Sequence, residues 1–147
     1  MSFSFRLARA EDDEELRAVS YEASMTDDGL YCLGYGREPS FFHSLDVEGS
    51  FHQTGFFVDE AGRGAATFTR SIRKLFVNGE VRDVGYLANA RVRPEFRGST
   101  LVFRGYKELE KLHRDGRCPF YLSTILDGNK RVIDLLTSAR ASLPTYH

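Results

Sequence analysis

The sequence predicts an α/β (α+β) domain built on a mixed, mostly antiparallel central sheet flanked by helices. Two observations predict it. Two long runs with strand-like alternation, Ala65–Phe76 and Val81–Val92, are separated by Asn78 and Gly79, which is a strong short-range signal for a β-hairpin. A proline then stops the second strand, and a helical run leads to another apolar stretch, which indicates a strand–helix–strand crossover. A meander plus one crossover gives antiparallel and parallel pairing in one sheet.

The N-terminal elements follow from local patterns. Phe3–Ala8 alternates large apolar residues with polar ones, which is typical of a strand. Glu11–Met25 predicts a helix, because acidic residues in its first turn suit a helix N-terminus and Asp12 or Asp13 can cap it.

The segment Thr26–Thr54 is rich in glycine and aromatic residues and resists assignment. Pro39 and Ser40 can open a short helix that continues through Leu45. Two interpretations of the rest stay open: an aromatic binding surface, or a lid packed on the core.

The remaining elements carry the crossover and the end of the chain. They are the strand Gly55–Glu60, a turn over 61–64, a helix from Leu101 that ends near Gly116, a short buried strand Phe120–Ile125, and a last helix Lys130–Arg140.

Composition excludes several classes of protein. The chain has 147 residues, 41% hydrophobic and 28% charged, so we expect one domain (1–147) rather than a disordered chain. Its formal net charge is −1, which argues against a non-specific nucleic-acid or membrane-surface binder. No run approaches 18 apolar residues and the N-terminus lacks a signal-peptide core, so we expect a cytoplasmic protein without a membrane span. Cys32 and Cys118 are expected to be reduced packing residues.

One stretch of the sequence indicates chemistry. Pro94 ends a strand, Arg97 and Gly98 form a loop, and a helix begins after Thr100. Exposed amides and the helix dipole at such a place can hold a pyrophosphate, and Gly98 lets the backbone approach a ligand closely. A loop that only turns a corner remains the alternative.

At this point the chain resembles the GNAT family, the Gcn5-related N-acetyltransferases. The match is carried by Val92-Arg93-Pro94, by Glu95-Phe96-Arg97-Gly98 against the family's Gln/Arg-x-x-Gly-x-Gly/Ala loop, by the strand and helix that follow, and by Asn129. The resemblance implies acetyl-CoA as co-substrate. Backbone near Val92 would pair with the pantetheine arm, and Asn129 would touch the cofactor. The pyrophosphate would be held by the amides of Arg97, Gly98, Ser99, Thr100, Leu101 and Val102.

The sequence departs from the family pattern at three positions and at its end. Thr100 and Val102 stand where small residues are usual, and Leu136 stands where a tyrosine usually protonates the leaving thiolate. The two strands that normally follow the last helix are lacking, so we expect an incomplete sheet whose edge a partner subunit covers, or a piece of a longer polypeptide.

The catalytic candidates come from the long strand and from the search for a replacement acid. Asp83, or Glu80, could accept the proton of the amine. Tyr86 or Tyr146 could replace the missing acid. A solvated surface role for Asp83 and a packing role for Tyr86 are the alternatives.

The predicted function is the transfer of an acetyl group from acetyl-CoA to a small-molecule or peptide amine by direct attack. The alternatives are an inactive GNAT-like domain that binds CoA or a partner protein, and a structural subunit. Thr26–Thr54 would shape the acceptor pocket. We expect no metal, because no His, Cys or Asp cluster has ligand spacing, no nucleic-acid or membrane partner, and a homo-oligomer or an edge-covering partner.

Overall fold

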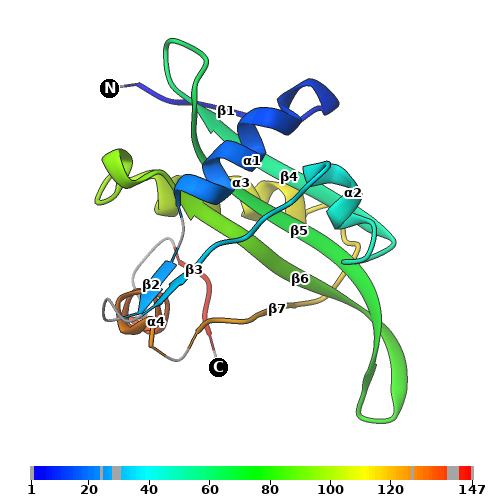
Figure 1. Cartoon of the computed structure of the whole chain (residues 1–147). Helices are drawn as coiled ribbons and strands as arrows, with labels where there is room; N and C mark the ends of the chain where they lie inside the picture. Colours follow the sequence, from blue (N-terminus) through cyan, green and yellow to red (C-terminus); the bar gives the residue numbers. More distant parts are fainter. Residues whose placement is uncertain (1, 24, 28–30, 127, 139–142, 147) are drawn as a thin grey trace.

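A computed structural model describes residues 2–23, 25–27, 31–126, 128–138 and 143–146 (Figure 1). In this part of the chain the main sheet has the strand order β1 (Ser4–Leu7), β4 (Phe51–Val58), β5 (Gly64–Val77), β6 (Glu80–Val92) and β7 (Tyr121–Ser123). The helices are α1 (Asp13–Glu22), α2 (Phe41–Leu45), α3 (Leu101–His113) and α4 (Lys130–Thr137), with short 3₁₀ turns η1 (Ala10–Asp12) and η2 (Pro94–Phe96). β2 (Met25–Asp27) and β3 (Tyr31–Leu33) form a separate antiparallel pair.

The mixed sheet predicted from the sequence is confirmed. β1, β4, β5 and β6 pair antiparallel, and β7 joins β6 in parallel after the crossover through α3. The β5–β6 hairpin turns at Asn78 and Gly79, whose φ angles of 54° and 84° are the positive values that a type I′ turn requires.

Helices cover both faces of the sheet, with α1 and α2 in front of it and α3 behind in Figure 1. The neighbours Phe56 and Phe57 point to opposite faces, as successive strand residues must. Phe56 joins Leu16, Val19, Phe41 and Leu45 in the core under α1 and α2. Phe57 joins the second core with Ala65, Ala66, Phe96 and Leu101.

Two N-terminal predictions need correction. α1 ends at Glu22, three residues before Met25, and neither Asp12 nor Asp13 caps it with its side chain. Instead Asp12 binds Arg6 and the amide of Arg9. The short helix after Pro39 is confirmed, and Ser40 caps it by accepting the amide of His43.

Two strands differ from the prediction in their boundaries or burial, which residue type alone does not determine. β4 begins at Phe51 rather than Gly55, because Phe51–Thr54 pair with β5 although their sequence does not alternate. The predicted buried strand Phe120–Ile125 is wrong in length and burial: β7 spans three residues, and Leu122 is 47% exposed. Apolar composition predicted a covered strand, whereas β7 is the last strand of the sheet order. In the described chain after α4, no further strand pairs with it.

Candidate functional site

The loop between β6 and α3 is anchored at one end and open at the other. Phe96, the last residue of η2, is 7% exposed and packs in the core, whereas Arg97, Gly98, Ser99 and Thr100 are exposed. Gly98 has φ 84°, and a Cβ built there meets no atom within 4 Å. The glycine is therefore required by the backbone conformation rather than by crowding.

Some of the N–H groups that were predicted to hold the pyrophosphate donate instead to acceptors within the loop. Arg97 N–H donates to the Pro94 carbonyl at 3.2 Å, and Ser99 N–H donates to the Phe96 carbonyl at 3.3 Å. Leu101 N–H makes a long 3.4 Å contact with Ser99 Oγ.

Four amides of the same segment stay open. Within the described residues, the N–H groups of Gly98, Thr100, Val102 and Phe103 have no acceptor. α3 has 13 residues, so these groups stand at the positive end of a full helix dipole. Open N–H groups at such a terminus favour an anionic ligand.

A gap opens between β6 and β7 beside this loop. The two strands pair only over Gly85–Leu87 and Tyr121–Ser123, so β6 continues to Val92 without a strand on that side in the described chain. Arg93 N–H donates to Ala65 of β5 at 3.0 Å. Because successive N–H groups of a strand point to opposite edges, the N–H of Val92 points away from β5, into the gap.

A β-bulge lies on β6 between the paired region and Val92. Ala88 is opposite Thr69 and Arg91 is opposite Thr67, so Asn89 and Ala90 together face one residue of β5. Asn89 has a φ of 54°, in the left-handed region. Bulges bend their strand and increase its twist, and this one begins two residues after Leu87, where the last β6–β7 pair lies.

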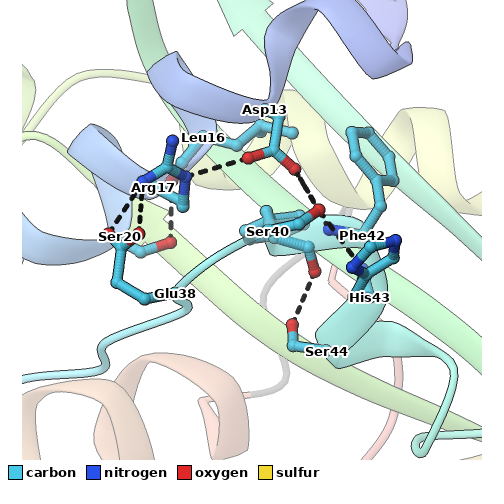
Figure 2. A network of polar contacts seen from close by, with 10 residues as sticks. Asp13, Leu16, Arg17, Ser20, Glu38, Ser40, Phe42, His43 and Ser44 are labelled. Carbon is cyan, nitrogen blue, oxygen red and sulfur yellow. Dashed lines mark hydrogen bonds and ion pairs between the residues drawn. The ribbon is translucent and has the colours of Figure 1, made fainter.

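A polar network ties α1 to α2 on the front face of the sheet (Figure 2). Asp13 Oδ1 accepts the Ser40 hydroxyl at 2.6 Å, and its Oδ2 accepts Arg17 Nε at 2.9 Å. Burial raises the pKa of Asp13, but the bonds from Ser40 and Arg17 outweigh it, so the pKa lies below its usual value. Arg17 also binds both carboxylate oxygens of Glu38 at 2.7 Å.

A shallow pocket of about 270 Å³ lies between α1 and the segment 35–38. It is lined by Glu14, Arg17, Ala18, Tyr21, Tyr35, Gly36, Arg37 and Glu38. The guanidinium of Arg91, on β6, lies 4.7 Å from the Tyr35 ring centre, and burial lowers its pKa. The pocket thus borders β6 where the bulge lies, and its lining combines two carboxylates, two guanidinium groups and two aromatic rings.

The predicted catalytic residues lie apart from the loop. Asp83 pairs with Lys74 at 3.0 Å, and its side chain is 47% exposed. It is nine residues from Val92, roughly 30 Å along an extended strand. Tyr86 is next to Leu87, where β6 and β7 separate. Its hydroxyl is bonded to Thr124 at 2.7 Å, and its ring lies under Arg73.

The polar C-terminal candidates, Asn129 and Tyr146, are engaged in hydrogen bonds within the chain. The Asn129 side chain caps α4 by accepting the Val132 amide at 3.4 Å. The Tyr146 hydroxyl bonds that of Tyr106, on α3, at 2.8 Å. Burial is the main cause that raises the Tyr106 pKa. Leu136 is 7% exposed and is a packing residue.

The described histidine and cysteine side chains add no second site. His52 lies 3.5 Å from Asp46, and His113 contacts the Tyr121 hydroxyl. Cys118 is buried and free, as predicted, whereas the side chain of Cys32 lies outside the described residues. Among the described residues, no group of three His, Cys, Asp or Glu side chains could hold a metal ion.

Sequence reasoning missed Arg37, Glu48 and Asn89. Arg37 donates to Glu48 at 3.1 Å and to Asn89 at 2.5 Å, which brings the segment before α2 onto the β6 bulge. The only local signal was an asparagine inside a strand, which is unfavourable there unless it takes a left-handed conformation.

No family model and no curated protein sequence matches this chain. Solved structures do match it. Glucosamine-6-phosphate N-acetyltransferase from Arabidopsis thaliana aligns with a TM-score of 0.62 and 20% identity, over 100% of this chain and 98% of that one. A Trypanosoma brucei acetyltransferase aligns at 0.64 and 17%, over 99% and 98%. The aminoglycoside N-acetyltransferase AAC(6′)-Iy, bound to a bisubstrate analogue containing CoA, aligns at 0.70 and 16%, over 100% and 95%.

These alignments confirm the resemblance at the level of fold. The chain has the mixed, helix-flanked sheet of the GNAT acetyltransferases. Among the described residues, no helix has the length and apolar character to cross a membrane.

Proposed function

We propose that this protein is an N-acetyltransferase that moves an acetyl group from acetyl-CoA to an amine. The observation that carries the proposal is the β6–β7 gap, which lies beside the open amides at the start of α3. An extended pantetheine arm needs a free strand edge, and a pyrophosphate needs N–H donors. β6 and α3 offer both within one continuous segment of chain.

The residues fit the cofactor in a specific way. The open amides of Gly98, Thr100 and Val102 would donate to the pyrophosphate, and Arg97 would add charge-assisted bonds. Val92 N–H would pair with the pantetheine arm. Ser99 and Leu101 shape the loop through their own contact, and Asn129 at the start of α4 stays a candidate contact.

The reaction has simple proton requirements. The amine attacks the thioester carbon, a C–N bond forms, and the C–S bond breaks to release CoA thiolate. A free amine has a pKa of about 10.4, so a base or water must take its proton. An N–H of β6 would stabilise the oxyanion. Asp83 remains the predicted base and Tyr86 or Tyr146 the predicted acid; Tyr86 is nearer the gap along β6.

The acceptor would enter through the pocket beside α1. Of its two carboxylates, Glu38 is paired with Arg17, which leaves Glu14 to attract a cationic amine, and Tyr35 offers an aromatic surface. A pocket of this size suits a small-molecule amine better than an amine on the surface of a folded protein.

The decisive experiment measures acetyl-CoA affinity by calorimetry for the wild type and for Gly98→Ala. A Cβ is strained at a φ of 84°, so we expect the variant to bind about tenfold more weakly. Gly62→Ala is the matched control, because Gly62 has a φ of 82° and equally open surroundings, in the β4–β5 turn. Equal affinity of the two variants for acetyl-CoA would contradict the proposed binding of the pyrophosphate by the loop amides.

A thiol-release assay with a panel of amines separates catalysis from binding. The buried Leu136, in place of the expected acid, favours a second candidate, a CoA-binding domain without turnover. CoA binding without thiol release from any amine would support that candidate.

A further inference from the structure

A chain of polar side chains crosses the front face of the sheet under α2. Thr54 and Thr69 share a hydrogen bond of 3.1 Å, and Asn89 Nδ2 donates to Thr69 Oγ1 at 3.3 Å. Arg37 then donates to Asn89 Oδ1 at 2.5 Å and to Glu48 Oε1 at 3.1 Å. The chain joins β4, β5 and the β6 bulge to the segments on either side of α2.

The ion pair at the end of this chain is buried. The side chains of Arg37 and Glu48 are 12% and 15% exposed. Glu48 Oε2 is buried and has no hydrogen-bond partner in the described part of the molecule. Buried ion pairs contribute little net stability, and an unpartnered carboxylate oxygen opposes folding. A structural role alone therefore does not account for the pair.

The pair is held firmly against its surroundings. Arg37 also donates to Ser44 Oγ at 2.5 Å, and its guanidinium lies over the Phe41 ring at 5.4 Å. Arg73 Nε donates to the Glu48 carbonyl at 2.7 Å. The guanidinium that reaches Asn89 is thus fixed from both ends of α2.

The target of this fixed guanidinium is the left-handed residue of the bulge. Asparagine tolerates a φ of 54° better than most residues, but it does not require it. Both polar ends of the Asn89 side chain are bonded, one to Arg37 and one to Thr69. These two hydrogen bonds hold the Asn89 side chain where the left-handed backbone places it, and so they favour that backbone conformation.

We propose that Arg37 and Glu48 act as positioning residues that hold Asn89 in its left-handed conformation and thereby keep the β6–β7 gap open. The bulge begins at Asn89, two residues after Leu87, the last β6 residue paired with β7. A bend at that point directs Ala90–Val92 away from β7. The inference rests on the proposed function, because it is acetyl-CoA that would occupy the gap.

The first test compares two variants of Asn89 by CoA calorimetry. Asn89→Ala removes the amide and disfavours the left-handed backbone, so we expect CoA to bind about five- to thirtyfold more weakly. Asn89→Gly removes the same amide but permits that backbone, so most of the affinity should remain. Equal losses in both variants would overturn the proposal.

A control variant separates the general effect of backbone strain from an effect specific to position 89. Asn78 is the other left-handed asparagine, with a φ of 54° at the tip of the β5–β6 hairpin. Asn78→Ala should lower the urea midpoint without weakening CoA binding. If it weakens CoA binding as much as Asn89→Ala does, the effect is general destabilisation and the proposal fails.

A double-mutant cycle then tests the clamp itself. Glu48→Gln should weaken CoA binding in the wild-type background and have little further effect in Asn89→Gly, because glycine no longer needs the clamp. The same loss in both backgrounds would overturn the role of Glu48. This cycle does not use Asn89→Ala, so it stays informative if that variant fails to fold.

A measurement on the free protein tests the role of Arg37 and Glu48 independently of CoA binding. NMR of the free protein reports the left-handed state of residue 89 through its Cα chemical shift. Loss of that signature in Glu48→Gln supports the clamp, and its retention overturns it. A wild type that binds no CoA would contradict the proposed function, while the NMR comparison still decides the clamp.

Discussion

Charged side chains with little exposure lie where separate elements of this protein meet. Arg70 is fully buried on β5 and binds Asp115, the Leu112 carbonyl and the Tyr121 hydroxyl, which attaches β7 and the end of α3 to the sheet. Arg93, 2% exposed, lies 3.1 Å from Glu15 and so ties α1 to the start of the loop between β6 and α3. Single arginines therefore fix the placement of whole elements around the candidate site.

Asp12 provides a test of this principle through pH. The bonds from Arg6 hold the Asp12 pKa below its usual value, despite an opposing effect of burial. A depressed pKa in the folded state gives stability that is present above the unfolded value of about 3.9 and lost as pH falls through the folded pKa. We expect Asp12→Asn to flatten the acid limb of stability against pH, measured by urea unfolding between about pH 2 and pH 6.

Glu11→Gln is the control for this measurement. Glu11 is exposed, and its distance to Arg9 is 3.8 Å, so its removal should leave the acid limb unchanged. An unchanged limb in Asp12→Asn would show that the Arg6 pair does not contribute to folding.

At the scale of elements, the β5–β6 hairpin organises the sheet. It pairs from Ala66 with Val92 to Val77 with Glu80, and its two-residue turn sets the register. The register in turn places the Asn89–Ala90 bulge opposite Phe68, and Val92 opposite Ala66 beside the gap. A local turn thus determines the position of the candidate site more than 30 Å away along the strand.

Gly79→Ala tests how much the turn contributes. Gly79 has a φ of 84°, which costs a residue with a Cβ about 1–2 kcal/mol, so we expect a loss of that size in the free energy of unfolding. Gly34→Ala is the control, because Gly34 has open surroundings and no positive φ. Urea denaturation with circular dichroism measures both. Equal stability of the two variants would mean that the turn is more adaptable than its angles indicate.

At the scale of the whole molecule, apolar surface lies along one edge of the sheet. Phe120, Leu122 and Leu126 are 38%, 47% and 38% exposed in and around β7. The hairpin arm extends away from the body in Figure 1, and its tip carries Phe76, 80% exposed. An unpaired apolar edge strand is prone to associate.

We therefore expect the protein to self-associate through β7. Light scattering after size-exclusion chromatography should give a multiple of the 16.7 kDa chain mass. Leu122→Lys places a charge at the edge and should reduce the mass to that of one chain. Val47→Lys is the control, because Val47 is 86% exposed and lies in the segment between α2 and β4, outside β7 and its neighbouring strand. A wild type that stays at one chain mass at all concentrations would contradict this prediction.

Much of the fold could be predicted because its signals are local. Asn78 and Gly79 demand positive φ, alternation marks β5 and β6, and Pro94 ends a strand whatever lies around it. The loop around Gly98 was found for the same reason, although only the structure shows which of its amides stay open. The burial of β7 and the start of β4 were mispredicted, because they depend on which strands lie alongside.

The sequence by itself determined the hairpin, the crossover and the loop that precedes α3, because each follows from the dihedral preferences of a few adjacent residues. Tertiary structure alone decided the bulge at Asn89 and its contact with Arg37, since these residues are 52 positions apart. It also decided where β6 and β7 separate. Such features depend on long-range packing, and no local pattern in the sequence encodes them.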